Sequence, residues 1–147
     1  MGSSDVPREL DLTSPRRVYI VGIGGAGMSA IATVLARMGH RVSGSDLKES
    51  RGLERLRLLG VYAEVGHRAG NVSSDVDAVV VSTAIPDSNA EVRAAVERGL
   101  PVLRRADALR ALAATHRTVA VAGSHGKTTS SSMLALILRA AIVFLLS

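Results

Sequence analysis

The sequence contains no cysteine, and only 2% of its 147 residues are aromatic. Without cysteine, a disulfide scaffold, a thiolate zinc site and thiol catalysis are all excluded. The scarcity of aromatic residues argues against binding of single-stranded nucleic acid, in which bases stack on aromatic side chains. The core must therefore be built from alanine, valine, leucine and isoleucine.

Metal-ligand spacing, basic stripes and long apolar runs are also missing. The four histidines, at positions 40, 67, 116 and 125, include no pair at metal-ligand spacing. The net charge of +5 suits an anionic ligand, but the basic residues are not gathered into a nucleic-acid footprint. The longest apolar stretch, residues 133–146, contains Arg139 and is shorter than the about 20 residues of a bilayer span. We expect no nucleic-acid partner, no membrane contact and a soluble, cytoplasmic protein.

Apolar runs and amphipathic helices alternate along residues 16–115. This alternation predicts an α/β fold, with a Rossmann-like parallel sheet covered by helices on both faces. The strands are expected at 17–24, 41–46, 61–66, 77–85 and 101–104, and the helices at 26–39, 52–60, 89–99 and 106–115. Residues 1–15 are polar and read as a disordered leader, whereas residues 116–147 read as the truncated start of a second domain, in which 117–123 form a strand.

The first glycine-rich stretch, Gly22–Gly27, fits the pattern G-x-G-x-x-G between an expected strand and an expected helix. Glycines let the backbone approach a pyrophosphate, whose charge is met by amides at the helix N-terminus. Asp46 ends the next strand, where an acidic side chain accepts hydrogen bonds from a ribose. The pattern does not distinguish NAD from a nucleotide sugar. Alternatively, the glycines only permit tight packing and Asp46 is a solvated loop residue.

The second glycine-rich stretch, Gly123–Thr128, is a shortened phosphate-binding loop. The strict P-loop pattern needs glycine at position 121, where this chain has Val121. The remaining G-x-x-G-K-T still offers loop amides, the Lys127 ammonium for phosphate oxygens and the Thr128 hydroxyl for Mg²⁺. Alternatively, the stretch is a polar turn. However, a lysine at a helix start is unfavourable unless an anion is bound there.

Several stretches together resemble the Mur ligase family, in the family's order and spacing. They are YIVGIGGAGMSAIATVLARMGHRVSGSD (19–46), GH (66–67), VVVSTAIP (79–86), RADAL (105–109) and VAVAGSHGKTTSSSM (119–133). The resemblance implies ATP-dependent ligation of L-alanine to UDP-N-acetylmuramate through an acyl phosphate, a step of peptidoglycan precursor synthesis, with ATP and Mg²⁺ as cofactors. It also implies that the chain is an N-terminal fragment of a three-domain ligase, able to bind the UDP-sugar but without turnover alone.

The resemblance assigns site residues to both glycine-rich stretches. It implies a UDP-sugar site, with the diphosphate on the first loop, made of Gly22, Gly24, Gly25, Ala26, Gly27, Met28, Ser29, Asp46, His67, Ser82, Thr83, Ala84 and Ile85. It implies an ATP site made of Gly123, Ser124, His125, Gly126, Lys127, Thr128 and Thr129. Lys127 and Thr128 would be catalytic, and Thr128 would bind Mg²⁺. Arg104 and Arg105 either serve an anionic ligand or start a solvated helix, and Arg105 matches a family motif.

Two other classes of function stay open. An NAD-dependent oxidoreductase would explain Gly22–Gly27 and Asp46, but not the second loop. A non-catalytic nucleotide-binding module would explain both loops without any chemistry. Sibling ligases of the family are further alternatives, although the sequence GIGGAGMS (22–29) favours the alanine-adding member.

Overall fold

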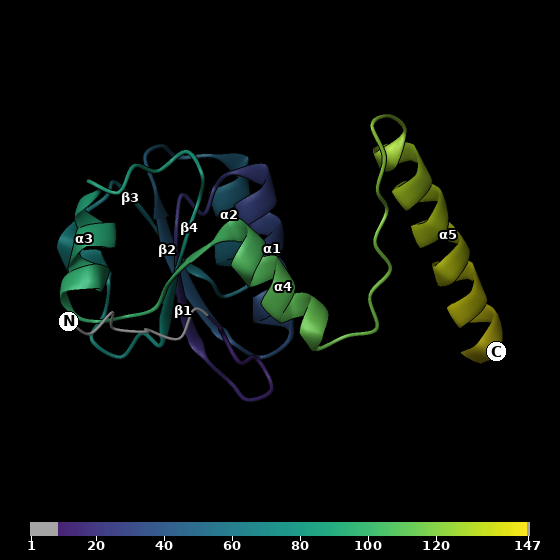
Figure 1. The fold of residues 1–147 in the computed structure, drawn as a ribbon, viewed down its shortest axis with the longest axis horizontal. Coiled ribbons are helices and arrows are strands. Elements are labelled where there is room, and N and C mark those ends of the chain that lie inside the picture. The colour runs from purple at the N-terminus through teal and green to yellow at the C-terminus, as the bar shows by residue number, and fades with distance from the viewer. Residues whose placement is uncertain (1–8, 147) are drawn as a thin grey trace, which may run out of the picture. The chain divides into compact units, whose positions relative to one another are not determined.

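The computed structural model describes the backbone of residues 9–146 and the side chains of residues 9–139. The chain divides into two compact units, the first ending at His116 and the second starting at Arg117. Within the first unit, a parallel sheet lies between two layers of helices (Figure 1). The predicted α/β fold is therefore confirmed.

The sheet has five strands in the order β3-β2-β1-β4-β5, and every neighbouring pair is parallel. The strands are β1 (Arg17–Val21), β2 (Arg41–Asp46), β3 (Tyr62–Val65), β4 (Ala78–Val81) and β5 (Val102–Arg104). The chain builds outward from β1 to β3 and then returns to place β4 on the other side of β1. The strand order therefore switches between β1 and β4, at the point where open α/β sheets bind their ligands.

Four helices and one short 3₁₀ helix cover the sheet. They are α1 (Ala26–Arg37), α2 (Arg51–Leu58), η1 (Ala69–Asn71), α3 (Ala90–Glu97) and α4 (Arg105–Ala114). Helices α1, α2 and α4 lie on one face, whereas α3 lies on the other (Figure 1). All four helices expected from the sequence are present, with ends that shift by one or two residues.

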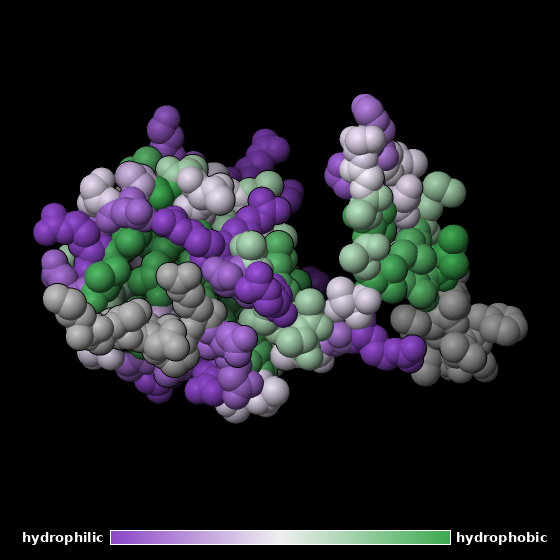
Figure 2. Space-filling model, viewed as in Figure 1, coloured by the Kyte–Doolittle hydropathy of each residue, from purple (hydrophilic) through white to green (hydrophobic). Residues whose placement is uncertain are grey.

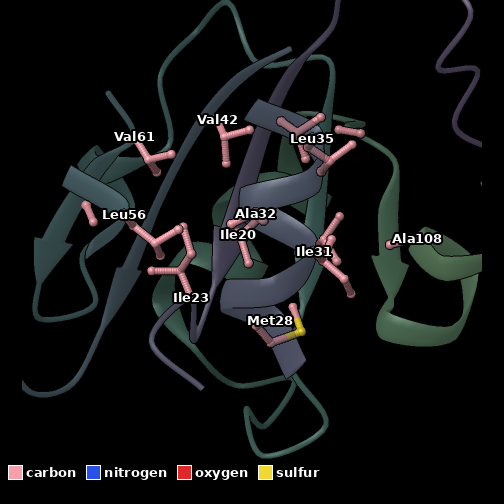
Figure 3. Close-up of a cluster of buried hydrophobic side chains, with 14 of the residues drawn as sticks. Ile20, Ile23, Met28, Ile31, Ala32, Leu35, Val42, Leu56, Val61 and Ala108 are labelled. Atoms are coloured by element: carbon pink, nitrogen blue, oxygen red, sulfur yellow. The ribbon is translucent and has the colours of Figure 1, made fainter. Parts of the chain in front are cut away.

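Two aliphatic clusters form the core, because successive side chains of a strand point to opposite faces of the sheet. Val18 and Ile20 pack under α1, α2 and α4, whereas Tyr19 and Val21 pack under α3. Figure 3 shows the first cluster, in which Ile31 and Leu35 come from α1 and Ile20 comes from β1. The central strands are buried on both faces, which explains why β1 and β4 read as continuous apolar runs.

Residues 9–15 differ from the predicted disordered leader. Leu12 is buried in the core, and Leu10 packs against the same cluster. The carboxylate of Asp11 accepts hydrogen bonds from Thr13 and from the guanidinium of Arg16. The prediction is wrong for this stretch because its two leucines can bury apolar surface against the helical layer. Residues 1–8 lie outside the described residues.

The second unit contains one helix, α5 (Lys127–Leu146). The strand expected over 117–123 is not formed, since no other strand of the described chain pairs with this segment. A single strand leaves its backbone hydrogen bonds unmade. The surface of α5 carries a group of exposed apolar side chains (Figure 2), which includes Met133, Leu136, Ile137 and Leu138. Of the described helices, none is long and apolar enough to cross a membrane.

Candidate nucleotide-binding site

The first glycine-rich loop connects β1 to α1 at the carboxyl edge of the sheet. Gly22 has a φ of 78°, in the left-handed region that side chains disfavour. A Cβ at Gly22 would also lie 3.0 Å from the Cβ of Ser82, just beyond β4. Backbone conformation and space therefore both require glycine at this position, where the paired strands β1 and β4 end side by side.

The loop uses its first amides to hold itself in place. The amides of Gly22 and Ile23 donate to the carbonyl of Ser45 at 2.8 and 2.9 Å. The amide of Gly24 donates to Oδ2 of Asp46 at 2.8 Å. Asp46 therefore fastens the loop to the end of β2, a role that the sequence did not predict for it.

The amides that remain for a ligand belong to the first turn of α1. This helix has Gly25 as its N-cap, with no side-chain cap and no acidic residue in the first turn. The N–H groups of Ala26, Gly27 and Met28 have no partner within a helix at these positions, so they suit an anion. The side chain of Met28 is buried in the core, so only its amide can serve a ligand. Ser29 donates its hydroxyl to the carbonyl of Ala26 at 3.1 Å.

A positive charge lies against this first turn. A Cβ at Gly27 would be 2.7 Å from Cζ of Arg105, so the guanidinium packs on the glycine. The neighbouring Arg104 instead pairs with Asp87, at 2.5 Å between Nη2 and Oδ1. The structure thus separates two arginines that are adjacent in the sequence. Arg105 faces the glycine loop, and its match to a family motif was the only sign of this in the sequence.

The segment Ser82–Ile85 turns back beside the glycine loop. The amide of Ser82 donates to the carbonyl of Val21 at 3.1 Å, and the amide of Ile85 donates to the carbonyl of Ser82 at 3.0 Å. The side chain of Ile85 lies near Gly22, since a Cβ there would meet its Cγ1 at 3.4 Å. Thr83 and Ala84 are exposed at this turn. The structure therefore brings this predicted segment and the predicted loop together.

His67 lies at the same edge of the sheet, beyond the end of β3. The preceding Gly66 donates its amide to the carbonyl of Asp46 at 2.7 Å, which ties this segment to β2. Nδ1 of His67 lies 2.8 Å from Oγ of Ser45 and 3.1 Å from Oε2 of Glu91. Its Nε2 is buried and has no hydrogen-bond partner among the described residues.

Glu91 is the residue that sequence reasoning missed. It follows the N-cap Asn89 in the first turn of α3, where an acidic residue is common, so nothing in the sequence distinguished it. In the structure its carboxylate is fully buried at the centre of what we call the Glu91 cluster. The cluster comprises Glu91, Tyr19, Ser45, His67 and Asn71, together with the amide of Arg68. Burial raises the pKa of the Tyr19 phenol above its usual range, so Tyr19 is a hydrogen-bond donor.

The second glycine-rich loop leads into α5. Gly123 and Gly126 have φ values of 150° and 74°, and the ammonium of Lys127 donates to the carbonyl of Gly123 across the loop. Nδ1 of His125 lies 3.2 Å from Oγ of Ser124. Thr128 and Thr129 lie in the first turn of α5 and are exposed. Two glycines with positive φ, and a lysine whose ammonium contacts the loop backbone, suit a phosphate ligand. Thr128 offers one hydroxyl oxygen to a metal ion.

In the described part of the chain, no three His, Asp or Glu side chains are grouped to hold a metal.

Together, the switch point, the open first turn of α1 and the adjacent arginine give this Rossmann-like domain a candidate nucleotide site. The sequence profile described as "Mur ligase family, catalytic domain" matches residues 17–117. The chain belongs to the Mur ligase family.

Individual relatives agree with this assignment. The UDP-N-acetylmuramate–L-alanine ligase of Saccharopolyspora erythraea is 53% identical over 137 residues, which are 90% of this chain and 28% of that protein. The solved UDP-N-acetylmuramate–alanine ligase of Thermotoga maritima has a TM-score of 0.77 at 34% identity, over 84% of this chain and 29% of that one. A solved UDP-N-acetylmuramate:L-alanyl-γ-D-glutamyl-meso-diaminopimelate ligase of Neisseria has a TM-score of 0.78 at 31% identity, over 87% of this chain and 40% of that one. The chain thus spans less than half the length of these relatives.

Proposed function

We propose that the first unit binds UDP-N-acetylmuramate, as part of a ligase that joins L-alanine to this UDP-sugar in peptidoglycan precursor synthesis. The observation that carries the proposal is the guanidinium of Arg105 against Gly27, beside the open amides of α1. Amides and a cation on one small surface are what a diphosphate requires. Asp46, His67 and Ser82–Ile85 lie at or just beyond strand ends on the same edge of the sheet, and we assign them to the uridine and the sugar.

The identity of the sugar nucleotide comes from the relatives. The two solved ligases and the Saccharopolyspora protein all carry UDP-N-acetylmuramate in their names, although the amino component that they add differs. The higher identity to the L-alanine ligase favours L-alanine as the second substrate. A ligase that adds a peptide to the same UDP-sugar is the second candidate, favoured by the equally close fold of the Neisseria protein.

The second unit supplies the beginning of an ATP site. The loop amides and Lys127 would hold phosphate oxygens, and Thr128 would give one oxygen ligand to Mg²⁺. ATP, when bound, supplies the phosphoryl group that activates a carboxylate for amide formation. Thr128 is the single oxygen ligand that we assign to the ion, whereas Mg²⁺ prefers octahedral coordination. We therefore expect no turnover from this chain, and alanine-dependent phosphate release would contradict that expectation.

Calorimetric titration of the 147-residue chain tests the proposal. UDP-N-acetylmuramate should bind saturably, whereas NADH, in a parallel titration, should not. Gly24→Val should abolish binding, because a Cβ at Gly24 would lie 2.5 Å from Cδ1 of Leu53 and 2.9 Å from Oδ2 of Asp46. Gly70→Val is the matched control, since a Cβ at Gly70 meets no atom within 4 Å.

The outcomes separate the remaining classes of function. Binding of NADH without binding of the UDP-sugar would replace the proposal with an oxidoreductase. Binding of the UDP-sugar that survives Gly24→Val would move the site away from the glycine loop. Circular dichroism of each variant confirms that a lost signal is not a lost fold.

A further inference from the structure

The hydrogen bonds of the Glu91 cluster determine where His67 carries its proton. Ser45 has one hydroxyl hydrogen, and it donates this hydrogen to Oε2 of Glu91 at 2.6 Å. Oγ of Ser45 also lies 2.8 Å from Nδ1 of His67, so in this second contact the hydroxyl oxygen must accept. The proton of that contact therefore belongs to Nδ1.

The contact between His67 and Glu91 also places a proton on Nδ1 of His67. Nδ1 of His67 lies 3.1 Å from Oε2 of Glu91. The other oxygen, Oε1, accepts from the Tyr19 hydroxyl at 3.0 Å, from the Arg68 amide at 3.1 Å and from Nδ2 of Asn71 at 2.7 Å. With Ser45 at Oε2, four donors other than His67 surround the two oxygens, which suits an ionised carboxylate that only accepts hydrogen bonds. The contact between His67 and Glu91 thus also requires a proton on Nδ1.

In the neutral form of His67, a proton on Nδ1 leaves the opposite ring nitrogen as an acceptor. A neutral imidazole protonated at Nδ1 carries a lone pair on Nε2. The His67 side chain is only 10% exposed, and Nε2 has no partner among the described residues. A buried polar atom without a partner is unfavourable, and a ligand that donates a hydrogen bond would remove that cost.

The position of His67 indicates which part of a nucleotide would donate a hydrogen bond to Nε2. The amide of Gly66 donates to the carbonyl of Asp46, whose carboxylate accepts from the amide of Gly24. His67 follows Gly66 and therefore lies at the edge of the sheet that carries the glycine loop. A nucleotide whose diphosphate lies on the first turn of α1 extends its nucleoside along this edge. A uridine offers two kinds of donor there: the N3–H of uracil and the hydroxyls of the ribose.

We propose that Glu91 is a positioning residue, which together with Ser45 fixes His67 in the Nδ1-protonated form so that Nε2 accepts a hydrogen bond from the nucleoside. This inference deepens the proposed function and rests on it. Glu91 acts through His67 and does not touch the ligand. The cluster thereby selects ligands that present a donor, rather than an acceptor, to Nε2.

The tautomer can be measured without any ligand. Nitrogen-15 NMR of the histidine-labelled chain distinguishes a protonated from an unprotonated ring nitrogen, and His67→Ala identifies the signals of His67. We expect a protonated Nδ1 and an unprotonated Nε2 at neutral pH. An unprotonated Nδ1, or protons on both nitrogens, would overturn the inference.

Glu91→Gln should reverse the tautomer. The three donors at Oε1 hold the glutamine carbonyl in the place of that oxygen, so the amide NH₂ takes the place of Oε2. The NH₂ group then donates to Nδ1, and the proton of His67 moves to Nε2, which becomes a donor.

In Glu91→Gln, the affinity for UDP should therefore fall about tenfold or more, as for an unmatched buried hydrogen bond. If Nε2 receives the uracil N3–H, CDP should lose less than UDP, because N3 of cytosine is an acceptor. Equal losses for UDP and CDP would identify a ribose hydroxyl as the donor.

Three further variants separate positioning from structural support. Tyr19→Phe removes one donor at Oε1 but leaves the contacts at Oε2 in place, so it should lower stability and leave the tautomer of His67 unchanged. His67→Ala should weaken UDP binding, and adding Glu91→Gln to it should weaken binding no further. His40→Ala is the matched control, because Nε2 of His40 is also buried without a partner among the described residues, whereas His40 precedes β2 at the opposite edge of the sheet. If Glu91→Gln weakens UDP binding equally with and without His67, Glu91 has only a structural role.

The two proposals can fail separately. A folded chain that does not bind UDP or UDP-N-acetylmuramate contradicts the proposed function, and the role of Nε2 toward a nucleoside fails with it. A chain that binds UDP but keeps full affinity in His67→Ala contradicts only the inference. The tautomer of the unsubstituted chain decides the proton assignment even if Glu91→Gln does not fold.

Discussion

The guanidinium of Arg105 lies on the α-carbon of Gly27, so closely that a Cβ at Gly27 would stand 2.7 Å from its Cζ. The contact joins the first turn of α4 to the first turn of α1, two helices on the same face of the sheet. Glycine at position 27 is needed less for its backbone conformation than for the room it leaves to the arginine. Positive charge and open amides thereby come together at one point.

Removal of this charge should weaken the UDP-sugar without unfolding the protein. We expect Arg105→Ala to lower the affinity for UDP-N-acetylmuramate about tenfold or more, since a hydrogen bond to a charged group contributes about 1.5–3 kcal/mol. Arg104→Ala is the control, because Arg104 is occupied by its ion pair with Asp87. Calorimetric titration gives both values. Equal losses from the two variants would show that only the general positive charge matters.

The packing of α2 predicts that a leucine-to-alanine substitution lowers the free energy of unfolding by different amounts at two positions. Leu56 is 1% exposed and lies in the core cluster of Figure 3, whereas Leu58 is 87% exposed. Leu56→Ala should lower the free energy of unfolding by about 2–5 kcal/mol, because it removes buried apolar surface and leaves a cavity. Leu58→Ala should change it by less than about 0.5 kcal/mol. Urea denaturation measures both, and similar values would mean that α2 does not pack as described.

The two tyrosines offer a test of the buried carboxylate. Tyr19 is buried and donates to Glu91, whereas Tyr62 is 67% exposed and donates to Glu64. Tyr19→Phe should lower the free energy of unfolding by about 1–3 kcal/mol, since it removes a buried hydrogen bond to a charged group. Tyr62→Phe should leave it nearly unchanged, because water replaces an exposed partner. If Tyr19→Phe is as mild as Tyr62→Phe, Glu91 does not depend on this donor.

The burial of His40 predicts a loss of stability in weak acid. Burial, and then the charge of Arg16, hold the pKa of His40 below its usual value of 6.5. Nδ1 of the folded histidine accepts a hydrogen bond from the amide of Arg16 at 3.1 Å, which protonation would break. Below a pH of about 6.5 the unfolded chain therefore binds more protons than the folded chain, so stability falls as the pH falls.

Urea denaturation at a series of pH values between about 7 and 5 measures this effect. The unsubstituted chain should lose more stability over this range than His40→Gln, which lacks the titrating group. Asp11 and Asp75, whose pKa values are lowered by hydrogen bonds, lose their contributions only at more acidic pH and do not interfere. Parallel pH profiles for the two proteins would contradict the prediction.

Most of the secondary structure could be predicted from the sequence because its signals are local. The apolar run before Gly22 and the helical periodicity after Ala26 each depend on neighbouring residues, and the structure has β1 and α1 there. The incorrect predictions concern segments whose structure depends on distant parts of the chain. Leu10 and Leu12 are ordered only because a helical layer is available to cover them, and residues 117–123 are not a strand because none of the described strands pairs with them.

The sequence by itself determined the alternation of strands and helices, the two glycine-rich loops and the membership of the family. These depend on residue type and short spacings, which a linear pattern records. The tertiary structure alone decided that Arg105 and not Arg104 faces the glycine loop, that Asp46 holds that loop, and that Glu91 is buried beneath His67. Each of these contacts joins segments far apart in the chain, so it depends on strand order and on which face of the sheet a side chain meets.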